Sequence, residues 1–161
     1  MAIQSRGLDD ASQKWSEEQE GRFMVAAGAM IEHVNTGRVL LMKRSAHVPF
    51  LPGVWEDIGG RLKQFEEPEE ALWREVREET GLEIEIIRPI SVFHLFHGER
   101  NAGNELIIIT YWCRSPSDHV VLSPEHSEYR WLPPEEALRL AEHEGVRKDC
   151  AAFLAALARD K

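Results

Sequence analysis

The sequence has little cysteine, and what it has is isolated. Among 161 residues there are two cysteines, Cys113 and Cys150, and neither belongs to a CxxC motif or a Cys/His cluster. A chain of this size does not need a disulfide to be stable, and free cysteines are usually buried as small apolar side chains. We therefore expect both thiols to be reduced and buried.

Long apolar runs are missing as well. No stretch approaches the roughly 18 consecutive apolar residues that a membrane-spanning helix needs. The first residues, MAIQSRGLDDASQKWSEEQEGR, are polar and acidic and lack the apolar core of a secretory signal. These absences predict a cytoplasmic protein with no membrane partner.

Positive charge is also scarce. Lysine and arginine number 19 against 28 aspartates and glutamates, for a formal net charge of −9. A protein that binds a nucleic-acid duplex needs a basic face for the phosphates, so a duplex is excluded as the main partner. A small phosphorylated ligand is still compatible, because a few basic groups or a carboxylate-held metal can receive its phosphates.

What is present fits one α/β domain. Hydrophobic residues make up 43% of the chain, which is enough for a sizeable core. We expect a polar N-terminal arm over residues 1–20 and a folded domain over 21–161, with strands interleaved with helices in a mixed sheet. Apolar periodicity and turn residues predict strands at 23–34, 38–44, 55–60, 82–95, 106–113 and 128–132, and helices at 68–80, 134–143 and 146–161.

The helix predicted at 68–80 carries an unusual acidic arc. At about 100° per residue, Glu75, Glu78 and Glu79 fall within an arc of roughly 100°. Carboxylates so close repel one another, and partial burial strengthens the repulsion, so a cation is expected among them. Oxygen ligands without histidine or cysteine favour Mg²⁺, or Mn²⁺, over zinc. The alternative is a solvated helix face.

The spacing around this arc resembles the signature of the Nudix (MutT-like) hydrolase family, G-x5-E-x7-R-E-U-x-E-E-x-G-U, where U is aliphatic. Every defined position is matched between residues 60 and 82. The matching residues are Gly60, Glu66, Arg74, Glu75, Val76, Glu78, Glu79, Gly81 and Leu82.

The resemblance implies an α/β/α sandwich with a mixed sheet and a Mg²⁺-dependent cut at a diphosphate linkage. It implies that the metal ligands are the Gly59 carbonyl, Glu75, Glu79 and Glu78, and Glu78 is alternatively the base that deprotonates water. It assigns structural roles to Gly60, Glu66, Arg74 and Gly81, with an ion pair between Glu66 and Arg74 holding the loop against the helix.

Several candidates lie outside the signature. The pattern E-H-x-x-Y-x-W-L resembles a recurrent family segment and makes Glu125 the preferred later acid for catalysis, over Glu128 and two acids in the 97–105 loop. Arg44 and Arg61 are candidate phosphate ligands, and Trp55 is a candidate for stacking on a base. The alternatives are a surface charge for Arg44 and core packing for Trp55.

The substrate is less constrained than the reaction. Our first expectation is a nucleoside triphosphate or modified nucleotide, because the family's markers for ADP-ribose and dinucleoside polyphosphates are missing and the coenzyme A pattern matches only in part. The alternatives are coenzyme A or nucleotide-sugar substrates, a nucleotide-binding module without catalysis, and a prenyl-diphosphate isomerase. The isomerase is disfavoured because both cysteines follow the signature. The oligomeric state cannot be read from these residues, and a homodimer is a candidate only by analogy, because dimers are common among relatives.

Overall fold

A computed structural model describes residues 20–160, so the predicted arm lies outside the described residues except for Glu20. The strands are β1 (Met24–His33), β2 (Val39–Arg44), β3 (Trp55–Glu56), β4 (Ile58–Arg61), β5 (Glu85–Phe96), β6 (Glu105–Ser115) and β7 (His126–Leu132). The helices are α1 (Pro68–Thr80), α2 (Pro134–Leu140) and α3 (Glu144–Arg159), with a 3-10 turn at Ala102–Asn104.

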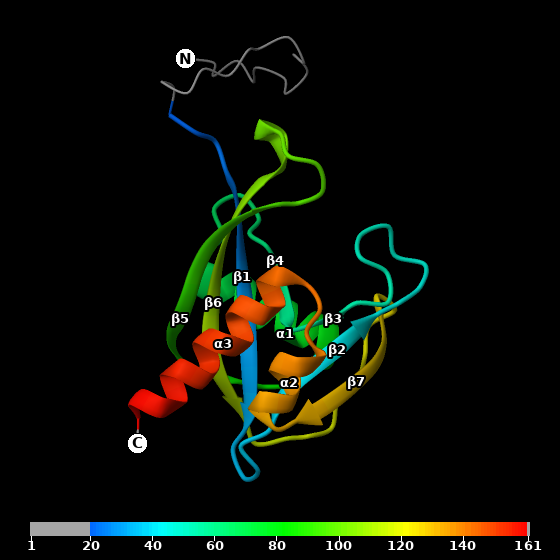
Figure 1. Ribbon diagram of the computed structural model, residues 1–161, viewed down its shortest axis with the longest axis vertical. Helices are drawn as coiled ribbons and strands as arrows, with labels where there is room; N and C mark the ends of the chain where they lie inside the picture. Colours follow the sequence, from blue (N-terminus) through cyan, green and yellow to red (C-terminus); the bar gives the residue numbers. More distant parts are fainter. Residues whose placement is uncertain (1–19, 161) are drawn as a thin grey trace.

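The sheet is mixed and centred on β1 (Figure 1). Strand β1 runs parallel to β6 over its whole length, whereas its pairings with β2 and β4 are antiparallel. Strand β5 completes one side against β6, and β3 and β7 both pair with β2. The predicted α/β class with a mixed sheet is confirmed.

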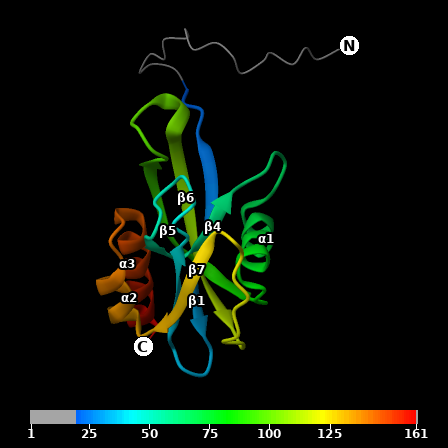
Figure 2. The same cartoon turned by 90° about the vertical axis from the view of Figure 1, so that its right-hand side faces the viewer.

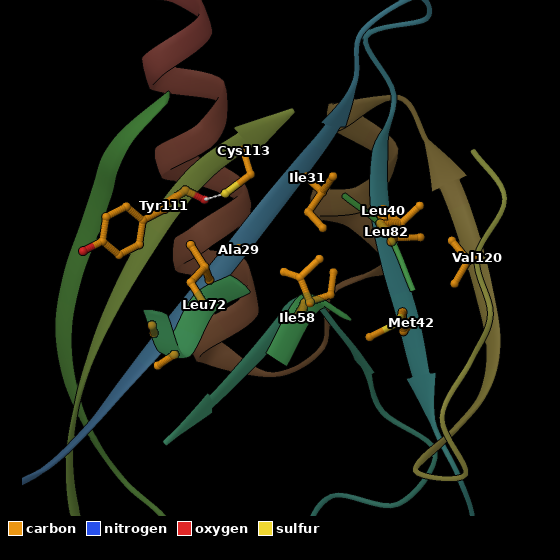
Figure 3. Packing of buried hydrophobic residues seen from close by; sticks show 13 residues of the cluster. Ala29, Ile31, Leu40, Met42, Ile58, Leu72, Leu82, Tyr111, Cys113 and Val120 are labelled. Atoms are coloured by element: carbon orange, nitrogen blue, oxygen red, sulfur yellow. Dashed lines mark hydrogen bonds between the residues drawn. The ribbon is translucent and has the colours of Figure 1, made fainter. Parts of the chain in front are cut away.

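Helices cover both faces of the sheet (Figure 2). Helix α1 lies on one face, and α2 and α3 lie together on the other, which makes the predicted three-layer sandwich. Alternate residues of a strand point to opposite faces, so neighbouring residues of β2 enter different cores. Leu40 and Met42 pack with Leu72 and Ile58 on the α1 face (Figure 3), while Leu41 packs under α2 and α3.

Most predicted boundaries agree with the structure. Helix α1 begins and ends at the expected residues, whereas β5 begins at Glu85 and not at residue 82. The helix predicted over 134–143 was too long: it ends at Leu140, and His143 instead caps α3 by accepting a hydrogen bond from the Gly145 amide. The cap at His143 therefore begins a new helix shortly after α2 ends, although helix-favouring residues continue between the two.

Both cysteines are free and buried, one in each core. Among residues 20–160, no helix has both the length and the apolar character that crossing a membrane requires.

Helix α1 is fixed at both ends. Pro68 occupies the first turn, where its missing N–H costs nothing, and the Glu70 carboxylate accepts a hydrogen bond from the Glu67 amide at 3.0 Å. Gly81 ends the helix with a left-handed backbone (φ 67°), and its amide donates to the Arg77 carbonyl. Glycine adopts that conformation without the steric cost of a side chain.

An ion pair holds the loop before α1 against the helix. Arg74 donates from Nε and Nη2 to the two carboxylate oxygens of Glu66, at 2.7 and 2.9 Å. The same guanidinium donates to the Arg61 carbonyl, and the Lys63 amide donates to Glu66. These hydrogen bonds lower the pKa of Glu66 to about 2, the Arg74 bond being the largest cause. The loop, the end of β4 and α1 therefore form one unit.

We predict that this ion pair makes stability depend on pH. Because the folded-state pKa of Glu66 lies below the usual value of 4.5, its contribution is complete above about pH 4.5 and is lost as the pH falls toward 2. Glu66→Gln should therefore lower the melting temperature at pH 6 to 7, and the gap from wild type should close below pH 4. Thermal unfolding between pH 2 and 7 measures this, with the exposed Glu69→Gln as control. A gap that is constant across the range would contradict the assignment.

Candidate active site

A cavity of about 920 Å³ lies at the end of the sheet where β4 meets β1. Its walls come from β2 and the loop after it, β4, α1, the loop before β7, and the start of α3. The predicted residues that line it are Arg44, Gly59, Gly60, Arg61, Arg74, Glu75, Glu78, Glu79 and Glu125. Segments far apart in the sequence thus meet around one space.

The absence of a side chain at Gly60 allows α1 to approach β4 closely. A Cβ atom placed on Gly60 would lie 2.1 Å from Cδ of Glu75, and one on Gly59 would lie 2.9 Å from the Ala27 carbonyl oxygen. Both positions are therefore closed to larger residues without displacement. The Glu75 carboxylate lies directly over the strand, where it contacts Arg74.

Glu79 of the signature carries a buried carboxylate oxygen. Its Oε2 atom is buried and has no hydrogen-bond partner among residues 20–160. Burial raises its pKa to about 9, and the neighbouring carboxylates of Glu56, Glu75 and Glu125 add to the rise, while Arg44 opposes it. Glu79 and these three carboxylates repel one another, and a cation bound among them would relieve that repulsion.

Backbone hydrogen bonds hold the loop that carries Glu125. The amides of Val121 and Ser123 donate to the carbonyls of Thr80 and Glu79, which are free at the C-terminal end of α1. On the other side, the Ser45 amide donates to the Glu125 carbonyl at 2.8 Å. The loop is therefore anchored to the helix that carries Glu79 and to the end of β2.

Arg44 is fixed at the edge of this cluster. Its Nε donates to the Phe50 carbonyl at 2.7 Å, and its Nη1 donates to Glu56 at 2.8 Å. The same Glu56 oxygen lies 2.9 Å from Nε2 of the buried His126. Within residues 20–160, Nη2 of Arg44 makes no hydrogen bond, so one edge of the guanidinium is available to a ligand.

The donor set suits a hard divalent cation. Carboxylate oxygens from Glu75 and Glu79 and the Gly59 carbonyl are the kind of ligand that Mg²⁺ or Mn²⁺ takes. In the part of the chain that the structure describes, no three acidic, histidine or cysteine side chains already surround a common point. Glu75 is instead turned toward Arg74, so a bound cation would have to compete with that ion pair.

Two predicted site residues, Trp55 and Glu78, are placed differently from the other predicted site residues. Trp55 does not line the cavity: it is buried in the core under α2 and α3, and Arg130 lies 4.6 Å from its ring centroid. The position fits the packing alternative and not a stacking role. Glu78 lines the cavity but its side chain is 58% exposed, so it lies at the rim.

The structure also brings in acids that we did not predict. Asp57, on the link between β3 and β4, and Asp149, on α3, both line the cavity. Burial raises the pKa of Asp57 well above its usual value, and Asp149 and Glu56 raise it further. No local pattern marks these residues, because their pairing joins segments about 90 positions apart in the sequence.

Aromatic rings also line the cavity. Phe50 and His97 stack with ring centroids 4.1 Å apart and planes inclined by 22°, so the loop after β2 meets the loop after β5. Phe93, on β5, lines the cavity beside α3. The cavity thus combines charged groups with flat apolar surfaces, an arrangement common to sites for small ligands.

Comparison with known proteins agrees with this geometry. A family model described as the NUDIX domain matches residues 22–153. The CTP pyrophosphohydrolase of Escherichia coli (strain K12) is 31% identical over 119 residues, which cover 73% of this chain and 82% of that protein. The nucleoside triphosphatase NudI of Escherichia coli O17:K52:H18 is 30% identical over 121 residues, covering 71% of this chain and 86% of that protein.

The fold is shared with solved structures as well. The crystal structure of a MutT protein from Methanosarcina mazei Go1 matches with a TM-score of 0.71 at 25% identity, covering 89% of this chain and 99% of that one. The family model, the relatives and this structure agree along most of the chain. The chain therefore belongs to the NUDIX family, whose members are hydrolases that act on phosphoric anhydrides.

Proposed function

We propose that this protein is a Mg²⁺-dependent pyrophosphohydrolase that cleaves the diphosphate linkage of a nucleoside diphosphate joined to another group. A nucleoside triphosphate or a modified nucleotide is the first choice of substrate. The observation that carries the proposal is the carboxylate cluster around the buried Oε2 of Glu79, which has no hydrogen-bond partner among residues 20–160 and lies at the wall of a cavity of about 920 Å³. Mn²⁺ is an alternative to Mg²⁺.

The charges of the cavity support a phosphorylated substrate. Arg44 presents one free guanidinium edge, and Arg61 and Lys63 line the same space. Guanidinium groups suit phosphate oxygens because they donate in a planar fork. The acidic side chains suit a bound metal ion, and the arginine and lysine side chains suit phosphates. Together they fit a ligand that brings both phosphates and a metal.

In the proposed reaction water attacks phosphorus and no covalent nucleophile is needed. Glu75, Glu79 and the Gly59 carbonyl would hold the cation, with Glu78 at the rim as a further ligand or a base. When bound, the cation supplies positive charge for the phosphate oxygens and makes the attacking water more acidic. Glu125 would accept the water's proton, because its loop is anchored beside Glu79. Gly60, Glu66, Arg74 and Gly81 position the helix.

The substrate choice draws on the names of the relatives. One is named for CTP and another for nucleoside triphosphates in general. Neither cysteine lines the cavity, so nothing in the structure favours the isomerase alternative. A cytoplasmic location, a homodimer and the division into a polar arm and a domain at residue 21 stay predictions.

We predict that Glu79→Gln reduces Mg²⁺-dependent hydrolysis by at least about 100-fold in kcat/KM, the scale for losing one group that supports transition-state charge. The measurement is release of phosphate or pyrophosphate from a panel of nucleoside triphosphates, nucleotide sugars, dinucleotides and coenzyme A. Glu69→Gln, an exposed change on the same helix, serves as control. Activity within about threefold of wild type would contradict the role of Glu79. Tight nucleotide binding by wild type without turnover would favour the non-catalytic alternative.

Glu125→Gln tests the proton acceptor. If Glu125 accepts the proton from water, kcat should fall by about 10²- to 10⁴-fold, and the acidic limb of the pH–rate profile should flatten. The Mg²⁺ concentration for half-maximal activity should change little. Glu128→Gln, three residues along the chain, is the matched control. A large change in Mg²⁺ requirement with a preserved pH profile would instead make Glu125 a metal ligand.

Gly60→Ala tests the close approach of α1. The new methyl group would collide with Glu75 and displace its carboxylate. We expect apparent Mg²⁺ affinity to fall by about 10- to 100-fold, the range for altering a group that orients a metal ligand. Titration of activity with Mg²⁺ measures the effect, alongside circular dichroism to verify folding and Gly103→Ala as control. An unchanged Mg²⁺ requirement would remove Glu75 from the cation site.

A further inference from the structure

His126 is a buried histidine that the proposed reaction does not use. Its side chain has no exposed surface, and it begins β7, directly after Glu125. Its Nε2 lies 2.9 Å from Oε1 of Glu56, and the buried Nδ1 has no hydrogen-bond partner among residues 20–160. A carboxylate accepts hydrogen bonds and donates none, so Nε2 carries the proton and His126 is the donor. In the neutral ring Nδ1 then has no hydrogen, and no N–H group is left buried and unpaired.

Three neighbouring strands bring His126, Glu56 and Arg44 together. Strand β2 lies between β3 and β7, and Arg44 of β2 stands opposite His126 of β7. Met42, two residues before Arg44, stands opposite Glu56 of β3. Opposite and alternate residues share a face of the sheet, so Arg44 and Glu56 project toward the face that Met42 shares with α1. His126 contacts Glu56 there, so the arginine is approached from both sides of its strand.

Glu56 is the acceptor that the other two residues share. Its Oε1 atom accepts a hydrogen bond from Nη1 of Arg44 at 2.8 Å as well as the one from His126. One oxygen held by donors from two strands fixes the direction of the carboxylate, because hydrogen bonds to charged groups are the strong ones. Arg44 and Glu56 line the cavity, whereas His126 does not. Any effect of His126 on a ligand therefore passes through Glu56.

The charges around Arg44 give this restraint a purpose. Glu56 raises the pKa of Glu79 and Arg44 lowers it, so both charges act on the acid at the proposed cation site. A guanidinium without the restraint could turn to the buried Oε2 of Glu79 and compete with the cation. The bonds to Glu56 and to the Phe50 carbonyl hold it instead with Nη2 unbonded within residues 20–160. A donor fixed in advance needs no ordering when a ligand arrives.

We propose that His126 is a positioning residue that holds Glu56, and through it Arg44, so that the Nη2 edge of the guanidinium meets the phosphates of the substrate. This inference rests on the proposed phosphorylated substrate. It adds to the site a residue that touches neither the substrate nor the cation. Loss of the Nε2 donor should therefore weaken substrate binding and leave the ligands of the cation in place.

Two amide substitutions separate the Nε2 donor from the rest of the side chain. Glutamine places its amide nitrogen the same number of bonds from Cβ as Nε2 of histidine, whereas asparagine places it at the distance of Nδ1. His126→Asn should lower kcat/KM for the best-cleaved nucleoside triphosphate by about 10-fold, mainly through KM, comparable with losing a residue that orients a metal ligand. His126→Gln should stay within about threefold of wild type. His119→Asn, at an exposed histidine outside the cavity, is the matched control.

A double-mutant cycle shows whether His126 acts through Arg44. In an Arg44→Gln background the guanidinium is gone, so adding His126→Asn should lower kcat/KM by no more than about a further threefold. A residue that only supported the fold would lower it by the same factor in both backgrounds. Thermal unfolding verifies each variant. If His126→Asn does not fold, His126→Leu, which fills the site without a donor, replaces it.

Three results would overturn the proposal. The first is a folded donorless variant with kcat/KM within about threefold of wild type. The second is a His126→Gln variant as impaired as the donorless one. The third is an equal loss in the wild-type and Arg44→Gln backgrounds.

Binding separates this proposal from the proposed function. Calorimetry with Mg²⁺ and the α,β-methylene analogues of ATP, GTP, CTP and UTP measures affinity without hydrolysis. If no nucleotide is cleaved but an analogue binds about 10-fold more weakly to His126→Asn than to wild type and to His126→Gln, the proposed function fails and the role of His126 stands. Equal affinity in the three proteins, or no binding to wild type, overturns the role of His126.

Discussion

The close approach of α1 to β4 is the constraint on which the rest of the site depends. Glu75 of this helix lies over Gly60 of β4, where a side chain on the strand would collide with its carboxylate. Leu72 and Val76 fill the core on the same side and hold the helix there. Apolar packing thus holds the carboxylates together despite their mutual repulsion.

Two arginines offset part of this negative charge, and each contacts different acids. Arg74 is bonded to Glu66 and contacts Glu75, so it belongs to the frame of the helix and its preceding loop. Arg44 is bonded to Glu56 and to the loop after β2, and its Nη2 makes no hydrogen bond within residues 20–160. Among the described residues, neither arginine makes a hydrogen bond to the buried Oε2 of Glu79. The deficit of positive charge is therefore concentrated at the position where a cation would bind.

The sequence could predict those parts of the site that depend on local spacing. Helix α1, its glycine end and its acidic arc follow from periodicity and capping. Contacts set by tertiary packing could not be predicted. Trp55 is adjacent to the site in sequence but faces the other core, and Asp149 meets Asp57 only because α3 covers that face. Alternation of apolar and polar residues along a strand would predict which face each side chain takes. Strand β3 has only two residues, which is too few to show that alternation.

Loops are usually the parts of a domain where insertions and deletions are best tolerated. The segment between β6 and β7 differs, because its amides complete the C-terminal end of α1 while its last residues place Glu125. Adding or removing one residue there would disturb the end of a buried helix and the position of an acid at once. Variation in length should therefore be confined to other connections, such as the 97–104 loop, and selection on stability would also preserve the site's geometry.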